Sequence, residues 1–149
     1  MTAQARTLAF CTGVLLEQGR RVDRFSRPLT MAALIVVLVY PSYSGREPLE
    51  LVGAFMLAAA AGLAEMYLAI RVAFDAALFH RAASVSDGDE WVELDEALTR
   101  LALLPKAKAG RHPEARVAGA RRLFRFQIAA LILQILLVLF AAGIAFLRI

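Results

Sequence analysis

Residues that carry most catalytic and metal-binding chemistry are scarce in this chain of 149 residues. One cysteine and two histidines exclude an internal disulfide and leave too few ligands for a typical zinc site. The chain has no glycine-rich phosphate loop, no HExxH and no GxSxG motif. In the acidic stretch 87–96 the glycine comes too early for a calcium-binding loop. The sequence therefore predicts no enzyme, no metal and no cofactor.

The dominant feature that is present is an uncharged run from Phe126 to Leu147, between Arg125 and Arg148. As a helix it would be roughly 33 Å long, enough to cross a bilayer core of about 30 Å. The whole chain is 60% hydrophobic, with a mean hydropathy of +0.61. These values predict an integral membrane protein.

Three transmembrane helices are expected in an all-α integral membrane protein, at about 28–43, 49–71 and 123–147. The first is short and has Pro28 in its first turn, a position that accepts proline. Two other interpretations of it stay open, a cleaved signal peptide and a re-entrant segment. The second should continue as helix to about residue 83, because no helix breaker intervenes. The polar turn 42–48 should join the first two as an antiparallel hairpin.

The positive charges alternate along the chain and predict its orientation. Lysine and arginine together number five before Pro28, one in 41–50, ten from Arg71 to Arg125 and one after that. By the positive-inside rule, the amino terminus and the 71–125 segment face the cytoplasm and the carboxyl terminus faces the periplasm. We therefore expect a multi-pass protein of a bacterial inner membrane. The same distribution argues against nucleic acid as a partner, despite a pI near 9.8.

The expected organisation is a single membrane domain in four segments: a cytoplasmic amphipathic helix at 1–27, a transmembrane hairpin at 28–73, a helical cytoplasmic segment at 74–122 and a transmembrane helix at 123–149. In the amino-terminal helix, apolar residues recur at helical spacing and form one stripe. They are Leu8, Cys11, Leu15, Val22 and Phe25. This stripe would lie either on lipid headgroups or on the rest of the protein.

Arginines gather where the expected spans meet the cytoplasm, and we expect them to contact the headgroups of anionic lipids. They are Arg20, Arg21, Arg24, Arg27, Arg121, Arg122 and Arg125. Simple anchoring explains the last three better than recognition of a particular lipid.

Glu65 lies six residues inside Arg71, where an ionised carboxylate is costly and needs a partner. Small residues share its helix face and a face of the last span, which predicts that these faces pack together. The packing residues are Ala54, Ala58, Gly62, Ala130, Ala141 and Ala145. Gln127 and Gln134 lie at matching depth, so we expect one or both to hydrogen-bond Glu65 in an intramembrane polar seam. The carboxyl group then either fixes helix register or handles protons or cations.

These features favour a noncatalytic subunit or scaffold of a membrane complex. Its expected partners are an anionic lipid bilayer and other membrane proteins or further copies of the chain. The alternative is a small channel or transporter component that uses Glu65 for protons or cations.

Overall fold

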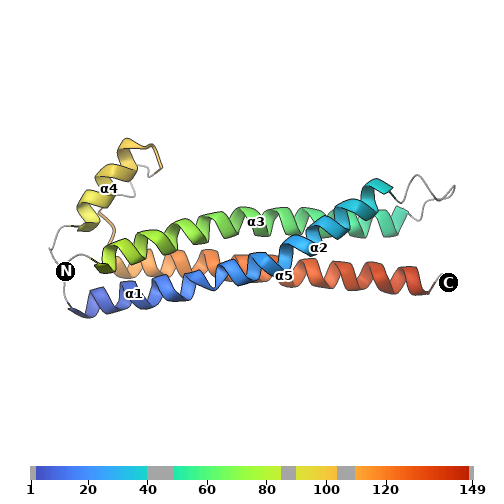
Figure 1. Ribbon diagram of the computed structural model, residues 1–149, viewed down its shortest axis with the longest axis horizontal. Coiled ribbons are helices and arrows are strands. Elements are labelled where there is room, and N and C mark those ends of the chain that lie inside the picture. The colour runs from blue at the N-terminus through green and yellow to red at the C-terminus, as the bar shows by residue number, and fades with distance from the viewer. Residues whose placement is uncertain (1–2, 40–48, 85–89, 104–109, 148–149) are drawn as a thin grey trace.

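The computed structural model describes residues 3–39, 49–84, 90–103 and 110–147, and every regular element in these ranges is an α-helix. The helices are α1 (Ala3–Glu17), α2 (Gly19–Val39), α3 (Leu49–Ser84), α4 (Glu90–Arg100) and α5 (Pro113–Phe146). Three long rods, formed by α1–α2, α3 and α5, lie side by side, and α4 lies beside one end (Figure 1). The expected all-α class is confirmed.

Helices α3 and α5 are long and apolar enough to cross a membrane. With 36 and 34 residues they measure roughly 54 and 51 Å, so each is about 20 Å longer than a bilayer core. The continuous helix expected from 49 to about 83 is present as α3. The hairpin at 42–48, the end of the first expected span and the start of the acidic stretch lie outside the described residues.

The amino-terminal rod corrects two expectations. A helix boundary expected between residues 27 and 28 is absent, and the two helices meet instead at Gln18. Pro28 consequently lies inside α2, not in a first turn. An interior proline costs about 3 kcal/mol in an isolated helix. Here Ser26 and Thr30, on either side of Pro28, are both hydrogen-bonded to Gln134 of α5, and this packing holds the helix on both sides.

The amino-terminal rod does not pack its apolar stripe on the rest of the protein, which was one of the two placements expected. Its apolar stripe points outward: Leu8 is 39% exposed, Leu15 40% and Phe25 74%. The buried face carries small or short side chains at the same helical spacing. They are Ala9, Thr12, Gly13, Gly19, Ser26, Thr30 and Ala33, with Leu16 as the one large member. Small residues let helix backbones approach closely, which explains why this face packs inward.

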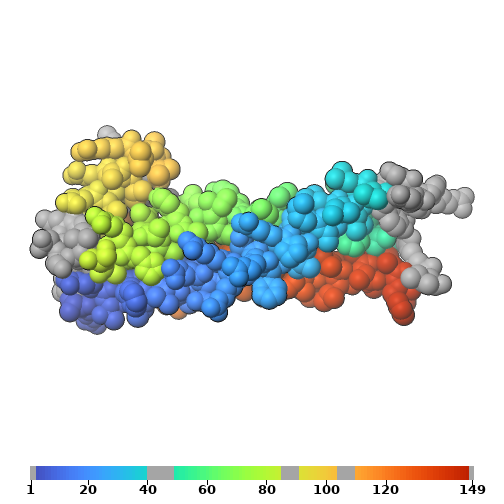
Figure 2. Space-filling model, viewed as in Figure 1, coloured from blue at the N-terminus to red at the C-terminus, as the bar shows by residue number. Residues whose placement is uncertain are grey.

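The three rods have a defined register. Helix α3 runs antiparallel to α1–α2, with Gly13 against His80, Gly19 against Val72 and Gly62 against Thr30. Helix α5 runs parallel to α1–α2, and the space-filling view shows the amino-terminal rod lying over the other two (Figure 2). This register places polar side chains from all three rods in the centre of the bundle.

Candidate functional site

The polar seam has a first layer around Glu65, whose residue exposure is 0%. The side-chain amide of Gln127 donates to Glu65 Oε1 at 2.7 Å and to the Gly19 carbonyl at 2.8 Å. One glutamine therefore connects α5 to both other rods. The structure brings Glu65 and Gln127 together and directs Glu65 into protein.

A second layer is formed around Gln134, which is also fully buried. Ser26 Oγ donates to Gln134 Oε1 at 2.7 Å, and Gln134 Nε2 donates to Thr30 Oγ1 at 2.8 Å. Thr30 in turn donates to the Ser26 carbonyl at 2.9 Å. Gln134 thus bonds α2 and not Glu65, so of the one or two glutamine bonds expected at Glu65 the structure shows one, from Gln127.

Two glycines make room for these layers. A Cβ on Gly19 would lie 2.7 Å from Gln127 Oε1, and one on Gly62 would lie 2.0 Å from Thr30 Oγ1. Both distances are shorter than any Cβ contact tolerates. Glycine at these positions therefore allows the polar side chains to cross between helices.

The expected packing residues divide into two groups. Ala54, Ala58, Gly62 and Ala141 are buried, whereas Ala130 and Ala145 are half-buried. The apolar layers beyond the seam combine such alanines with larger neighbours, as where Ala33 and Ala58 pack against Leu137. The seam is therefore enclosed by tight helix contacts on the side away from α4.

Reasoning from the sequence missed three residues of the seam, Gly19, Ser26 and Thr30. The signal was present, because small and hydroxyl residues recur along the amino-terminal helix at spacings of three, four and seven. Such a pattern is typical of helix contacts in lipid. The larger apolar residues on the opposite face drew the prediction away from it.

The register also changes where the charged residues of α2 lie. Because Gly19 packs against Val72, Arg20 is level with Arg71. Arg27 comes seven residues later, roughly 10 Å further along the bundle. It lies near Glu65, where it contributes to that carboxylate's electrostatic surroundings. Arg27 and Arg71 therefore lie at different levels of the bundle.

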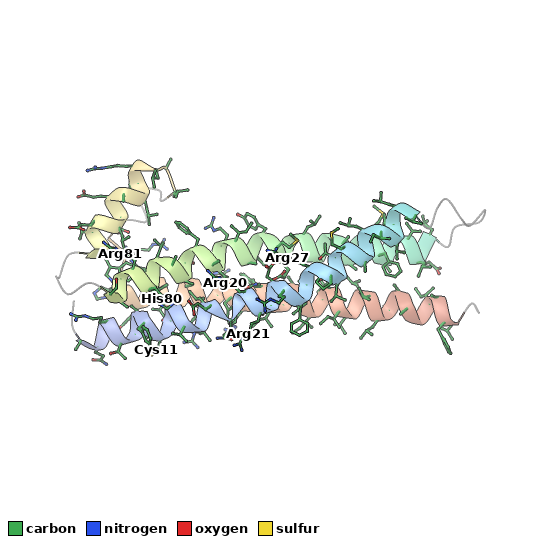
Figure 3. All side chains as sticks on the ribbon, viewed as in Figure 1. Cys11, Arg20, Arg21, Arg27, His80 and Arg81 are labelled. Atoms are coloured by element: carbon green, nitrogen blue, oxygen red, sulfur yellow. The ribbon has the colours of Figure 1, made fainter. Side chains whose placement is uncertain are left out.

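All seven arginines expected at lipid headgroups are exposed: Arg20, Arg21, Arg24, Arg27, Arg121, Arg122 and Arg125. Arg27 forms an ion pair of 2.7 Å with Asp23. Arg122 lies over the ring of Phe126 at 5.3 Å from the ring centre. In Figure 3, Arg20 and Arg27 lie on the edge of the rod that faces α3, whereas Arg21 points from the opposite edge.

At the α4 end of the bundle, His80 is held between α1 and α3. A Cβ on Gly13 would lie 3.0 Å from the imidazole, so the missing side chain leaves space for the ring. The ring meets Phe10 edge to face, and its Nε2 lies 3.1 Å from Glu17 Oε1. These contacts explain His80 as a packing residue of the α1–α3 contact.

Helix α4 is fastened to the bundle by a cluster around Trp91. The indole meets Phe79 of α3 edge to face at 5.7 Å between ring centres, and the Arg116 guanidinium of α5 lies 4.8 Å from its ring centre. Arg116 also forms a 2.5 Å ion pair with Asp95, which accepts the Gly110 N–H at 2.7 Å. Burial alone would raise the pKa of Asp95, but the hydrogen bonds and the Arg116 charge outweigh it and lower the pKa.

A groove of about 760 Å³ runs between α3, α4 and α5. Its lining includes the rings of Phe74 and Trp91 together with Arg71, Arg122 and Asp75. Burial raises the pKa of Asp75, and the nearby Arg71 charge offsets part of that effect. The lining carries four arginines, Arg71, Arg111, Arg116 and Arg122, and one aspartate, so the groove is positively charged overall, although Arg116 is paired with Asp95 of α4.

Comparison with known proteins gives no functional information. No protein-family model, no curated protein and no solved structure matches the chain. In the part of the chain that the structure describes, no group of three or more acidic, histidine or cysteine side chains is placed to hold a metal. The function has to be argued from the seam and the surfaces around it.

Proposed function

We propose that this chain is a noncatalytic multi-pass membrane protein that serves as a subunit or scaffold of a membrane complex. The observation that carries the proposal is the use of Glu65, Gln127 and Gln134 to fasten the three rods together. Buried polar groups in lipid are expensive, and here most of their bonding capacity is taken up by neighbouring helices.

The outer surface supports the same proposal. Large apolar side chains cover the outward face of α5, with Leu136 59% exposed and Phe140 62% exposed. On α3, Leu57 is 60% exposed. Surfaces of this kind suit lipid or the helices of another membrane protein. Partners would be other membrane proteins or further copies of this chain.

In this proposal residues 28–43 form a third span beside α3 and α5. The bundle lies in a bacterial inner membrane with its amino terminus and α4 in the cytoplasm and its carboxyl terminus in the periplasm. The support is the arginine-rich sequence at one end of the bundle, which matches the positive-inside rule.

Site-specific photo-crosslinking in native membranes tests the subunit proposal. A photoreactive residue is placed singly at Leu136, Phe140 and Leu57, which sample two outward faces. We expect one discrete protein adduct from one face and none from the other. Size measurement of the purified chain in mild detergent should show the same assembly. A monomer that gives only lipid adducts at all three positions would contradict the proposal.

A second candidate function is favoured by two specific atoms. Glu65 Oε2 and Gln127 Oε1 are buried and have no hydrogen-bond partner among the described residues. A buried carboxyl group that lies beside Arg27 and has an oxygen without a hydrogen-bond partner has the chemistry to exchange a proton, as a small channel or transporter component would require.

The Glu65→Gln variant separates the two candidates, because it keeps the shape of the side chain and removes its titration. A scaffold should retain its assembly and thermal stability, and neither wild type nor variant should carry protons in proteoliposomes. A transporter should show proton flux that Glu65→Gln abolishes while the fold is preserved. Flux of that kind would replace the scaffold proposal with the second candidate.

A further inference from the structure

A pocket of about 370 Å³ opens between α2 and α3. One wall is charged and comes from α2, and the other is small and apolar and comes from α3. The lining residues are Arg20, Asp23, Arg24, Arg27, Ala69, Ile70 and Ala73. The three arginines follow each other at spacings of four and three, so one face of α2 carries them all.

The pocket has an excess of positive charge. Three arginines and one aspartate leave a formal charge of +2. Asp23 forms an ion pair of 2.7 Å with Arg27. Arg20 and Arg24 have no ion-pair partner among the described residues. Guanidinium groups in this arrangement bind phosphate oxygens through paired hydrogen bonds. The charged wall therefore selects an anion, and a phosphate group suits it best.

The other wall indicates that the anion carries an apolar part. Ala69 and Ala73 have no polar side-chain atoms, and Ile70, which completes the wall, is 70% exposed. A free phosphate ion would gain nothing from these surfaces. An acyl chain would cover them.

The position of the pocket along the bundle gives the strongest reason for a ligand. Arg20 is level with Arg71, as the packing of Gly19 on Val72 requires. Arg24 and Arg27 lie roughly 6 and 10 Å further toward the apolar part of α3. Arginine at such depth is costly unless its head reaches water or an anion. A headgroup drawn in beside α2 would supply that anion.

We propose that this pocket binds the phosphodiester of an anionic phospholipid, with Arg20 and Arg24 on the phosphate, the start of the lipid's apolar part against Ile70 and Ala69, and the acyl chains leaving toward the apolar part of α3. The inference rests on the proposed membrane location. It goes further in assigning one defined site to these residues. Arg21 lies on the opposite edge of the rod (Figure 3) and is not among the lining residues.

Native mass spectrometry of the full chain released from nanodiscs tests the site. The nanodiscs contain phosphatidylcholine with or without phosphatidylglycerol. We expect wild type to retain one phosphatidylglycerol in preference to phosphatidylcholine. Arg20→Gln combined with Arg24→Gln should weaken retention at least tenfold, and both changes avoid the ion pair. Arg21→Gln is the matched control for either single change, because it removes one positive charge from the same helix, and it should change retention less than twofold.

Two results would overturn the inference. Equal losses for Arg21→Gln and Arg24→Gln would show a diffuse charge effect without a defined site. Protection against heating by inorganic phosphate equal to that by phosphatidylglycerol would show a site for free phosphate. Carbonate extraction distinguishes these failures from failure of the proposed function, because a chain released by carbonate is not integral to the membrane.

Discussion

Alanine in place of Gly62 should destabilise the bundle, and alanine in place of Gly53 should not. Both glycines lie in α3, so the two substitutions add the same methyl group to the same helix. A Cβ at Gly62 would lie 2.0 Å from Thr30 Oγ1 and 2.5 Å from Gln134 Nε2. At Gly53 it would meet nothing within 4 Å.

The magnitude follows from three contributions. Replacing a helical glycine with alanine stabilises by up to ~1 kcal/mol, which is all that Gly53→Ala should show. Overpacking at Gly62 costs about 1–3 kcal/mol. Disrupting the buried bond between Gln134 and Thr30 costs about 1–2 kcal/mol more. Gly62→Ala should therefore lose about 1–4 kcal/mol of unfolding free energy.

Unfolding in mixed micelles, followed by far-ultraviolet circular dichroism, measures both variants. Thr30→Ala supplies the decisive double variant, because it removes the hydroxyl that the new methyl group would strike. The combined variant with Gly62→Ala should lose at least ~1 kcal/mol less than the sum of the two single losses. Additive losses, or a Gly62→Ala protein as stable as Gly53→Ala, would refute the packing described for the seam.

Asp95→Asn should release α4 at a cost of about 2–3 kcal/mol, because its ion-pair arginine loses a charged partner. The fluorescence of Trp91, the one tryptophan in the chain, should shift to the red. Glu96→Gln, at an exposed pair of α4, should leave the spectrum unchanged. Because the pKa of Asp95 is lowered, its stabilisation is complete above its ordinary pKa and is lost on acidification below about pH 4. Wild type should show the red shift there; an unshifted spectrum well below that pH would contradict the assignment. Gly13→Val should lower the melting temperature by crowding His80 at 3.0 Å, and an unchanged melting curve would argue against that contact.

The helices themselves were largely predictable, because hydrophobic runs and breakers dictate them locally. The uncharged run after Arg125 and the unbroken stretch beyond Glu65 became α5 and α3. The expected boundary at Pro28 was wrong for a non-local reason. Proline opposes helix locally, but bonds from another helix hold the chain on both sides of it. No pattern within the segment reveals such bonds.

The seam was predictable in part. Depth measured from flanking charges brought Glu65 and Gln127 to the same level, and the structure places them in contact. The same reasoning left open a second bond, from Gln134 to Glu65, whereas that glutamine bonds Ser26 and Thr30. That alternative came from treating the seam as a contact of two helices. The amino-terminal rod is the third member of the seam, and its short hydroxyl side chains gave a weaker signal than the large apolar residues beside them.

The even spacing of the two seam layers has a consequence for how the helices find one another. Gln127 donates to the carbonyl of Gly19 and Gln134 lies at Ser26, so two pairs seven residues apart repeat the same offset. Apolar helices in lipid slide past one another at little cost, and a heptad repeat alone would permit a slip of seven. A slip of α2 in one direction would set Gln134 at Ala33 and Gly62 at Val37, and a slip in the other direction would set them at Gly19 and Asp23. Neither Ala33 nor Gly19 has a hydroxyl group for Gln134, Val37 is bulkier than Thr30, and Asp23 is charged. The two layers therefore find their polar partners together at one alignment only, and that alignment specifies the register of the bundle.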